Sequence, residues 1–288
     1  MIQMAQKHIR VSLVIPAYNE EHHIKACLDC IASQSVKPYE VILVDNNSTD
    51  HTVEIAARYP FVRVLKENHQ GIVFARNSGF DAARGDVIGR IDVETHIPED
   101  WIQRVQDIFT DSDVDAVSGS LTFHDVPFRH FFARIDLFFR CYLARSLARH
   151  RQLFLYGGNM AIRKKAWESV RSKLCHDLRN HEDLDLSAHM AGGVYNVIFD
   201  KYLSAAVSAR RVDNDPHTYY VYVVANSRTY LRHSLRGRFY MYPVEWLVVI
   251  FYMPLRLLYR SYDPSTQRFS IRLLMVQPYE PRISPISE

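Results

Sequence analysis

Short runs of Val, Ile and Leu alternate with amphipathic stretches along the first 120 residues of the chain. This alternation is typical of βαβ units, in which apolar strands form a mainly parallel sheet and helices cover both of its faces. The expected strands lie at residues 11–16, 41–45, 62–65, 86–92 and 114–120. The expected helices lie at residues 20–33, 52–58, 70–84 and 98–109. The hydrophobic pattern therefore predicts an α/β fold.

The pattern changes after residue 120. Residues 128–149 form a long amphipathic segment with Phe at helical spacing, and an Arg- and aromatic-rich region occupies residues 213–288. Within it, residues 246–255 are an apolar run that is too short for a spanning helix, which needs about 20 apolar residues. We expect both apolar segments either to pack onto the core or a dimer partner, or to lie in a membrane interface. From Asp263 onwards we expect an extended tail.

Composition narrows the class of protein. The 288 residues have a formal net charge of only +3 and 48% hydrophobic residues, as in ordinary globular proteins, and give no indication of nucleic-acid binding. Cys27 and Cys30 form a C-x-x-C pair inside a predicted helix rather than at its N-terminus, so we interpret them as thiols without a redox role. Because cysteines are few and the first residues lack a long apolar region, we expect a cytoplasmic protein without a secretory signal.

Acidic residues follow two of the predicted strands. Asp45 ends the second strand, and Asp92 and Glu94 follow the fourth. In open α/β sheets, ligands bind outside the carboxyl ends of the strands. On an extended backbone, Asp92 and Glu94 would point the same way and offer oxygen ligands to Mg²⁺ or Mn²⁺. The simpler alternatives are a turn aspartate at Asp45 and solvated surface acids at the other two positions.

The loop after the first strand carries Pro16, Ala17, Tyr18, Asn19 and Glu20. Its backbone amides and tyrosine ring can hold a base and a ribose. Alternatively, Asn19 caps the helix that follows, which is a common role for asparagine.

Three arginines and two glycines are further candidates for ligand contact. Arg76, Arg210 and Arg211 can bind diphosphate oxygens through the forked guanidinium group, although surface arginines are commonly solvated. Gly157 and Gly158 either let the backbone approach a ligand closely or form a tight turn.

Carboxylates cluster again at Glu182, Asp183 and Asp185. A carboxylate close to a metal–diphosphate site can accept the proton of an attacking hydroxyl. The alternative is a helix N-terminus that is enriched in acids by the helix dipole. His217 is a late candidate for a metal ligand, but a lone surface histidine is the favoured interpretation.

Six short motifs follow one another in order: VSLVIPAYNEE (11–21), VILVDNNSTD (41–50), ARNSGFDAARGD (75–86), RIDVET (90–95), GGNMAIR (157–163) and HEDLDL (181–186). Their order, spacing and flanking strands resemble those of family 2 glycosyltransferases with the GT-A fold, a Rossmann-like α/β fold. The resemblance implies a GT-A domain at residues 1–212, with a nucleotide-binding part at about 9–120 and an acceptor part at about 121–212. A helical C-terminal extension is expected at 213–288.

The resemblance also implies an activity. We expect inverting transfer of a hexosyl or N-acetylhexosaminyl group from a UDP- or GDP-sugar to a glycan or lipid-linked acceptor, in cell-surface polysaccharide or glycolipid synthesis. The expected cofactor is Mg²⁺ or Mn²⁺, with Asp92 and Glu94 as its ligands. The acceptor class and the aromatic segments suggest a peripheral position on the inner face of the cell membrane, with Arg256 and Arg260 at the lipid headgroups.

Residue roles follow from the same resemblance. Asp183 is the expected catalytic base, and Glu182 is expected to bind the acceptor or to orient the base. The expected nucleotide-sugar-binding residues are Pro16, Ala17, Tyr18, Glu20, Asp45, Arg76, Asp92 and Gly158. Two positions depart from the common pattern of the family: Glu94 replaces the second Asp of Asp-x-Asp, and Asn46–Asn47 replaces Asp-Gly after Asp45.

Two other classes of protein are the alternatives. The first is a catalytically silent nucleotide-sugar-binding or membrane-associated protein of the same fold, which the change to Glu94 would fit. The second is a nucleotidyltransferase, but that class commonly has a glycine-rich, basic phosphate loop near the first strand, where this chain has the acidic sequence IPAYNEE. The intact pair Glu182 and Asp183 favours the transferase.

Overall fold

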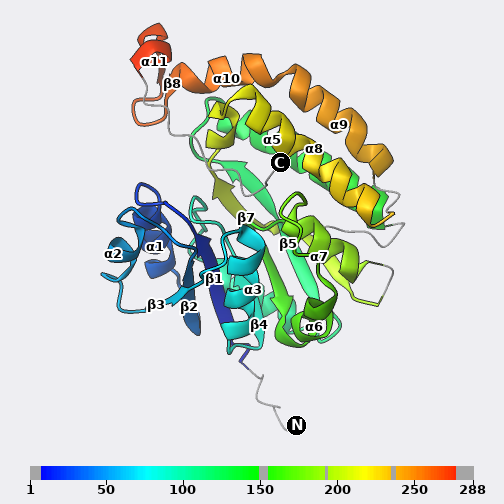
Figure 1. The fold of residues 1–288 in the computed structure, drawn as a ribbon. Helices are drawn as coiled ribbons and strands as arrows, with labels where there is room; N and C mark the ends of the chain where they lie inside the picture. Colours follow the sequence, from blue (N-terminus) through cyan, green and yellow to red (C-terminus); the bar gives the residue numbers. More distant parts are fainter. Residues whose placement is uncertain (1–7, 149–154, 192–193, 235–237, 277–288) are drawn as a thin grey trace.

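The computed structural model of the protein describes residues 8–148, 155–191, 194–234 and 238–276 (Figure 1). Within these residues the main sheet has seven strands in the order β3-β2-β1-β4-β6-β5-β7, and β6 alone runs antiparallel to its neighbours. The strands are β1 (Val11–Ala17), β2 (Glu40–Asp45), β3 (Val62–Lys66), β4 (Val87–Arg90), β5 (Ala116–Phe123), β6 (Met160–Arg163) and β7 (Val197–Val207). The predicted mainly parallel sheet is confirmed.

Helices cover both faces of the sheet because successive strand side chains point to opposite sides. Leu13 and Ile15 of β1 share one core cluster with α1 (Ile24–Ala32) and α4 (Trp101–Phe109). Val14, between them, belongs to the cluster on the other face. That second cluster includes residues of three helices, α3 (Ile72–Ala82), α6 (Lys164–Val170) and α7 (Glu182–Met190). The remaining short helices of this part are α2 (Thr52–Ala56), η1 (Arg171–Lys173) and η2 (Arg210–Asp213).

The C-terminal region is helical, as expected, and lies with α5 beside one end of the sheet (Figure 1). Tyr219, Val223 and Tyr252 form a small core of its own. The described part of the expected tail, residues 263–276, is not extended: a short hairpin begins at Tyr262, and another helix follows it. The elements are α5 (Arg129–Ala148), α8 (Pro216–Arg232), α9 (Arg238–Ile250), α10 (Tyr252–Arg260), β8 (Tyr262–Asp263), β9 (Arg268–Phe269) and α11 (Ile271–Val276). Residue 149 of the amphipathic segment and residues 277–288 lie outside the described residues.

Two boundaries differ from the prediction in ways that shape the site. The helix expected at 20–33 begins only at Ile24, because Asn19 has a left-handed backbone (φ 52°) and its side chain accepts a hydrogen bond from Thr49 N. The strand expected at 86–92 ends at Arg90, and a turn follows in which Thr95 N donates to Asp92 O at 3.0 Å. Asp92 and Glu94 therefore do not lie on one face of an extended strand, and that prediction is wrong.

The expected helix start at Pro98 is also wrong. The helix begins three residues later, at Trp101, whose N–H donates to the carbonyl of Pro98 at 3.1 Å. The same carbonyl accepts a hydrogen bond from Gln34 Nε2 at 2.6 Å. Pro98 thus anchors the loop before α4 to the end of α1 instead of opening the helix.

Candidate active site

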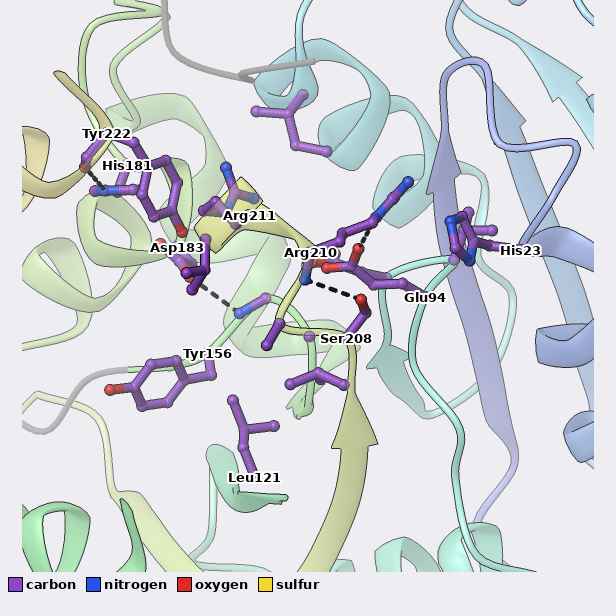
Figure 2. Close-up of a pocket in the computed structure, with 18 of the residues that line it drawn as sticks. His23, Glu94, Leu121, Tyr156, His181, Asp183, Ser208, Arg210, Arg211 and Tyr222 are labelled. Carbon is purple, nitrogen blue, oxygen red and sulfur yellow. Dashed lines mark hydrogen bonds and ion pairs between the residues drawn. The ribbon is translucent and has the colours of Figure 1, made fainter. Parts of the chain in front are cut away.

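A cavity of about 1020 Å³ lies at the carboxyl ends of the parallel strands. The loops after β1, β4 and β7 line it, as do Gly157 and Gly158 before β6. These glycines reach the same edge because β6 runs opposite to the other strands. The N-terminus of α7 and side chains from α8, α9 and α10 complete the wall. The motifs from both halves of the 1–212 region therefore face one space, part of which is drawn in Figure 2.

The loop after β1 lines the cavity with the predicted residues Pro16, Ala17, Tyr18 and Glu20. Asn19 also lines it and does not cap α1, since its side chain instead holds the loop at Thr49. The capping alternative is therefore wrong.

Asp45 is placed differently. Its carboxylate is only 6% exposed and accepts a hydrogen bond from Ser48 N at 3.0 Å, which is the geometry of an aspartate that holds a turn. Asn46 lines the cavity, whereas Asp45 is not one of the described residues that line it. The contact between Asp45 and a base stays a prediction.

Glu94 and Glu20 are both bound to one arginine. Arg210 Nε lies 2.5 Å from Glu94 Oε2, and Arg210 Nη2 lies 2.6 Å from Glu20 Oε1. The Arg210 side chain is 12% exposed, so the alternative of a solvated surface charge is wrong for this residue. Burial and the charge of Arg210 lower the pKa of nearby His23 to about 4. An arginine contributed by η2, after β7, thus joins the first motif to the acidic turn after β4.

Arg90 was not singled out from the sequence, yet it connects the two acidic motifs. Its Nη2 lies 2.7 Å from Glu182 Oε1 and 3.3 Å from Asp92 Oδ1, and its side chain is 3% exposed. Burial disfavours the charged form, but Glu182 and Asp92 raise the pKa of Arg90 above its ordinary value. A charged residue at the end of an apolar strand was the available signal, because such a group is buried only with partners.

Asp183 lies at the start of α7 and faces the cavity (Figure 2). Its Oδ2 accepts a hydrogen bond from Gly157 N at 3.0 Å, and its Oδ1 accepts one from Leu184 N at 2.8 Å. Burial and the neighbouring charge of Glu182 raise the pKa of Asp183. For Glu182, burial acts in the same direction, but Arg90 and Arg76 outweigh it and lower the pKa. The pKa values of the two neighbouring carboxyl groups are thus shifted in opposite directions, which is a common arrangement of catalytic acids and bases.

Arg76 lies behind the cavity rather than in its wall. It is fully buried, its Nη1 donates to the backbone carbonyl of Glu182 at 3.1 Å, and its guanidinium carbon lies 5.5 Å from the centre of the Trp167 ring. Burial lowers its pKa to about 10. This placement does not support the expected diphosphate contact and instead makes Arg76 a support for the start of α7.

The glycines before β6 have separate roles. A Cβ on Gly157 would lie 2.6 Å from the guanidinium carbon of Arg90, whereas a Cβ on Gly158 would meet nothing nearer than 3.6 Å. Gly157 is therefore required by the packing of Arg90. Asn159 belongs to the core: it accepts a hydrogen bond from Trp101 Nε1 at 2.9 Å.

Side chains of the C-terminal helices form one wall of the cavity. Tyr222 of α8 packs edge-on against His181, and the guanidinium carbon of Arg211 lies 3.7 Å from the centre of the Tyr222 ring. His217 is exposed at the start of α8 and does not line the cavity, so the structure does not bring it to the acidic turn. The region beyond residue 212 thus belongs to the site, although none of the recognised motifs lies there.

The charges on the described wall do not balance. It carries six carboxylates and three arginines, which leaves three negative charges in excess. The acids are Glu20, Asp92, Glu94, Glu182, Asp183 and Glu245, and the arginines are Arg90, Arg210 and Arg211. A diphosphate would be repelled by such a wall unless a cation accompanied it.

The sequence model described as Glycosyl transferase family 2 matches residues 12–171, more than half of the chain. The chain therefore belongs to glycosyl transferase family 2. Glycosyltransferase AglE of Haloferax volcanii is 32% identical over 120 residues, which cover 39% of this chain and 40% of that protein. Uncharacterized glycosyltransferase EpsJ of Bacillus subtilis is 33% identical over 111 residues, which cover 37% of this chain and 32% of that protein. The match spans less than half the length of either relative.

Solved structures share the fold. A mannosyltransferase from Pyrobaculum calidifontis, in complex with GDP-Man and Mn²⁺, superposes with a TM-score of 0.61 at 17% identity and covers 94% of this chain and 79% of its own. Glucosyl-3-phosphoglycerate synthase from Mycobacterium tuberculosis, in complex with Mn²⁺, UDP-glucose and phosphoglyceric acid, gives 0.54 at 18% identity and covers 79% and 80%. The predicted family and GT-A fold, and with them the class of transferase enzymes, are confirmed.

Proposed function

We propose that the protein transfers a sugar from a nucleotide-sugar donor to an acceptor hydroxyl, with inversion at the anomeric carbon and with Asp183 as base. The main support is that the raised-pKa carboxylate of Asp183 faces the same cavity as the loop after β1 and the acidic turn after β4. The acceptor oxygen forms its bond to the anomeric carbon while the bond to the diphosphate breaks and the leaving group takes the electron pair. The hydroxyl proton passes to Asp183.

We further propose a divalent cation as cofactor, held by Asp92. The Asp92 side chain is 21% exposed in the cavity wall, and the three excess negative charges of that wall favour a cation. Mg²⁺ and Mn²⁺ accept oxygen ligands, and Mg²⁺ is commonly held by one or two carboxylates together with substrate phosphates. Such an ion, when bound, would neutralise charge on the departing diphosphate. The residues of this wall therefore fit a divalent cation.

Glu94 fits as a second ligand only with a rearrangement, since Arg210 occupies one of its oxygens. A diphosphate entering beside Arg210 competes for the same guanidinium group, because charge-assisted hydrogen bonds to phosphate resemble those to carboxylate. In our proposal Arg210 turns from Glu94 to the diphosphate as the donor binds, and Glu94 then becomes available to the cation. The loop from Pro16 to Glu20 would hold the nucleoside.

The acceptor side of the cavity supports a lipid-linked or otherwise amphipathic acceptor. Apolar side chains from β5, the following loop and the C-terminal helices line this side: Leu121, Phe123, Val126, Pro127, Phe132, Val223, Val248, Leu255 and Leu258. Burial of apolar acceptor surface against them would be favourable at roughly 25 cal/mol per Å². Arg211 offers a positive charge at the same wall.

We also propose contact with an anionic membrane surface. Large apolar side chains of α9 and α10 are exposed, among them Trp246 (66%), Ile250 (67%) and Phe251 (52%). Phe128 and Phe131 of the α5 region are exposed as well, next to the exposed Arg129. No helix in the described part of the chain is long and apolar enough to cross a membrane. Aromatic and basic side chains together suit an interface position.

The expected headgroup contacts of Arg256 and Arg260 are not supported. Arg256 Nε lies 3.4 Å and Arg260 Nε 3.5 Å from Asp213 Oδ1, and both side chains are mostly buried. Their charges stabilise the contact of α10 with η2. Among the described residues, the exposed arginines nearest the ends of this region include Arg129 and Arg134 of α5, Arg268 of β9 and Arg272 of α11.

A panel of UDP- and GDP-sugars with Mn²⁺ and with short glycan or polyprenyl-phosphate acceptors tests the proposed function. We expect release of nucleoside diphosphate with one donor class, and the anomeric configuration of the product by NMR should be opposite to that of the donor. A retained configuration would contradict the single displacement. Donor binding without any release, across the panel, would favour the catalytically silent alternative.

A further inference from the structure

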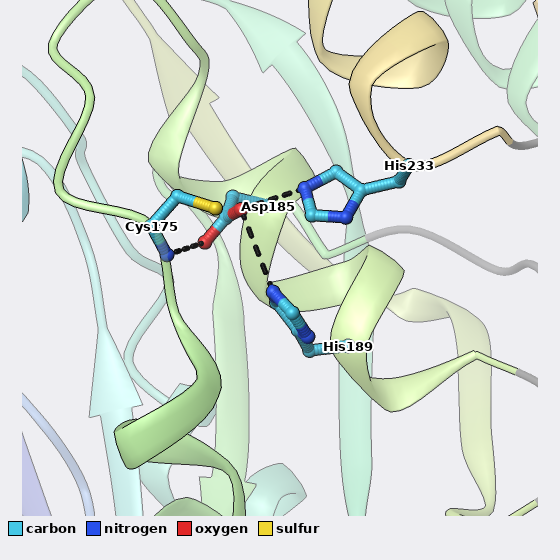
Figure 3. Close-up of side chains that lie close together, drawn as sticks. All are labelled: Cys175, Asp185, His189 and His233. Atoms are coloured by element: carbon cyan, nitrogen blue, oxygen red, sulfur yellow. Dashed lines mark hydrogen bonds and ion pairs between the residues drawn. The ribbon is translucent and has the colours of Figure 1, made fainter.

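A second group of ligating side chains lies on the side of α7 away from Asp183. Cys175 precedes α7, Asp185 and His189 belong to α7, and His233 follows the end of α8 (Figure 3). One ligand atom from each of these residues lies within 4.8 Å of all the others. His233 Nε2 is 2.7 Å from Asp185 Oδ1, and His189 Nε2 is 3.8 Å from the same oxygen. Residues distant in the sequence thus converge on one buried carboxylate.

The hydrogen bonds inside this cluster do not satisfy all of its polar atoms. Asp185 is 1% exposed and accepts a hydrogen bond from Cys175 N at 3.0 Å. His189 Nε2 is buried and has no hydrogen-bond partner among the described residues. Leaving a buried polar nitrogen without a partner costs free energy, so such atoms commonly indicate a missing ligand or ion. Arg232, a cation beside the thiol, is paired with Asp177 at 2.9 Å.

We propose that Cys175, Asp185, His189 and His233 bind a Zn²⁺-type ion. One thiolate, one carboxylate and two imidazoles make up the N/O/S ligand set that zinc accepts in tetrahedral sites. Bonds of about 2.0–2.3 Å place tetrahedral ligand atoms roughly 3.3–3.8 Å apart, so side-chain movements on the order of 1 Å would close the site. On binding, the thiol proton leaves to solvent and sulfur bonds to the metal, with no change of oxidation state.

Four protein ligands would make this a closed, structural site. The ion would join the segment before α7, the helix α7 itself and the end of α8. Because Asp185 stands on the same helix as Asp183, the ion would fix the base-bearing helix to the C-terminal helices. This role is one of positioning. It does not depend on the proposed transfer reaction, and it is distinct from the oxygen-ligand site at Asp92.

Titration of metal-free protein with Co²⁺ tests the proposal. We expect a thiolate-to-cobalt charge-transfer absorption that saturates at one equivalent and is abolished when Zn²⁺ displaces the cobalt. Cys175→Ser should remove the band, and His189→Asn should weaken binding at least about tenfold, since even residues that only support metal ligands have effects of this size. Zn²⁺ should raise the melting temperature of the wild-type protein but raise that of Cys175→Ser much less.

Two control variants make the assignment specific. Cys141→Ser removes a cysteine of α5 that is no part of the cluster, and it should keep the band. Asp92→Asn should also keep it while losing metal-dependent nucleotide binding, which separates the two sites. A wild-type protein that shows no band and binds no stoichiometric zinc would overturn the proposal, as would an unchanged band in Cys175→Ser. If Cys175→Ser does not fold, the titrations of the wild-type protein and of His189→Asn decide whether the metal site exists.

Discussion

The sheet region and the C-terminal helices differ in how far their apolar side chains are buried. All seven residues of β1 are buried, and the cores on both faces of the sheet are closed by helices. On α9 and α10, by contrast, Trp246, Ile250 and Phe251 are more than half exposed, and the local core there is small. Both regions line one cavity. This difference fits our proposal that side chains at the sheet edge and the start of α7 carry the chemistry, whereas the C-terminal helices contact the acceptor and the membrane.

Removal of the cation should have the largest effect. We expect EDTA, or Asp92→Ala, to reduce transfer to the level without enzyme, because the six carboxylates of the wall outnumber its three arginines and Arg210 by itself would not offset the charge of the diphosphate. Initial rates of nucleoside diphosphate release measure this, and calorimetry should show weaker metal-dependent nucleotide binding. Restoration of activity by Mn²⁺ after EDTA is the control. Full activity in EDTA would place the cation outside the mechanism.

Substitution of the base comes next. Asp183→Asn keeps the size of the side chain but cannot accept the proton, so kcat should fall by about 10²–10⁴-fold with donor affinity nearly unchanged. Glu168→Gln, an exposed acid of α6, is the matched control and should keep full activity. A normal turnover number for Asp183→Asn would exclude that residue as the base.

Loss of the buried arginine should destabilise the sheet edge. Arg90→Met leaves Glu182 buried without its 2.7 Å partner, and breaking such a pair costs about 3–5 kcal/mol. Chemical denaturation of the single variant and of the double variant Arg90→Met/Glu182→Met measures the effect. The double variant should recover much of the lost stability, since no unpaired charge remains. Equal losses in both variants would show that packing, rather than the ion pair, is what Arg90 supplies.

The pH dependence of transfer should reflect Asp183. A base must be deprotonated, so activity is lost as pH falls through its pKa, about tenfold per unit below it. Because burial and Glu182 raise this pKa, the acid limb of kcat should lie above pH 3.8, the ordinary value for the residue. Rates measured from acid to neutral pH, over a range in which thermal denaturation shows the fold intact, test this. An acid limb at or below the ordinary value would contradict the assignment.

Membrane contact should show the smallest effect. Trp246→Ser combined with Ile250→Ser should weaken binding to anionic liposomes about tenfold, because two of the large exposed apolar side chains of α9 would no longer enter the interface. The free energy of unfolding should change little, since both side chains are exposed. Val194→Ser, also exposed but in the turn before β7, is the control for flotation. If the wild-type protein never floats with such liposomes at low salt, the membrane proposal is wrong and these side chains would instead contact a protein partner.

Local sequence was sufficient for the sheet and for the list of motifs. The strand predicted at residues 11–16, which is β1 (Val11–Ala17) in the structure, is predictable because continuous apolar runs bounded by turns are typical of buried parallel strands. The candidate residues at Asp92, Glu182 and Asp183 were found because acids follow strands or open a helix. Element ends were less predictable, since side-chain hydrogen bonds from distant loops, such as that of Asn19 with Thr49, decided them.

The partners of the buried charges were decided only by the tertiary structure. Arg90 binds Glu182, Arg210 binds Glu20 and Glu94, and no local pattern encodes contacts across such sequence distances. The place of Arg76 was also decided by the tertiary structure. Its position on a helix suggested a phosphate ligand, but the structure buries it behind the cavity, at the start of α7. The sequence by itself determined where the strands run and which acidic residues are candidates for catalysis and metal binding. Packing decided which charges are neutralised inside the protein and which face the cavity, because burial tolerates a charge only beside its partner.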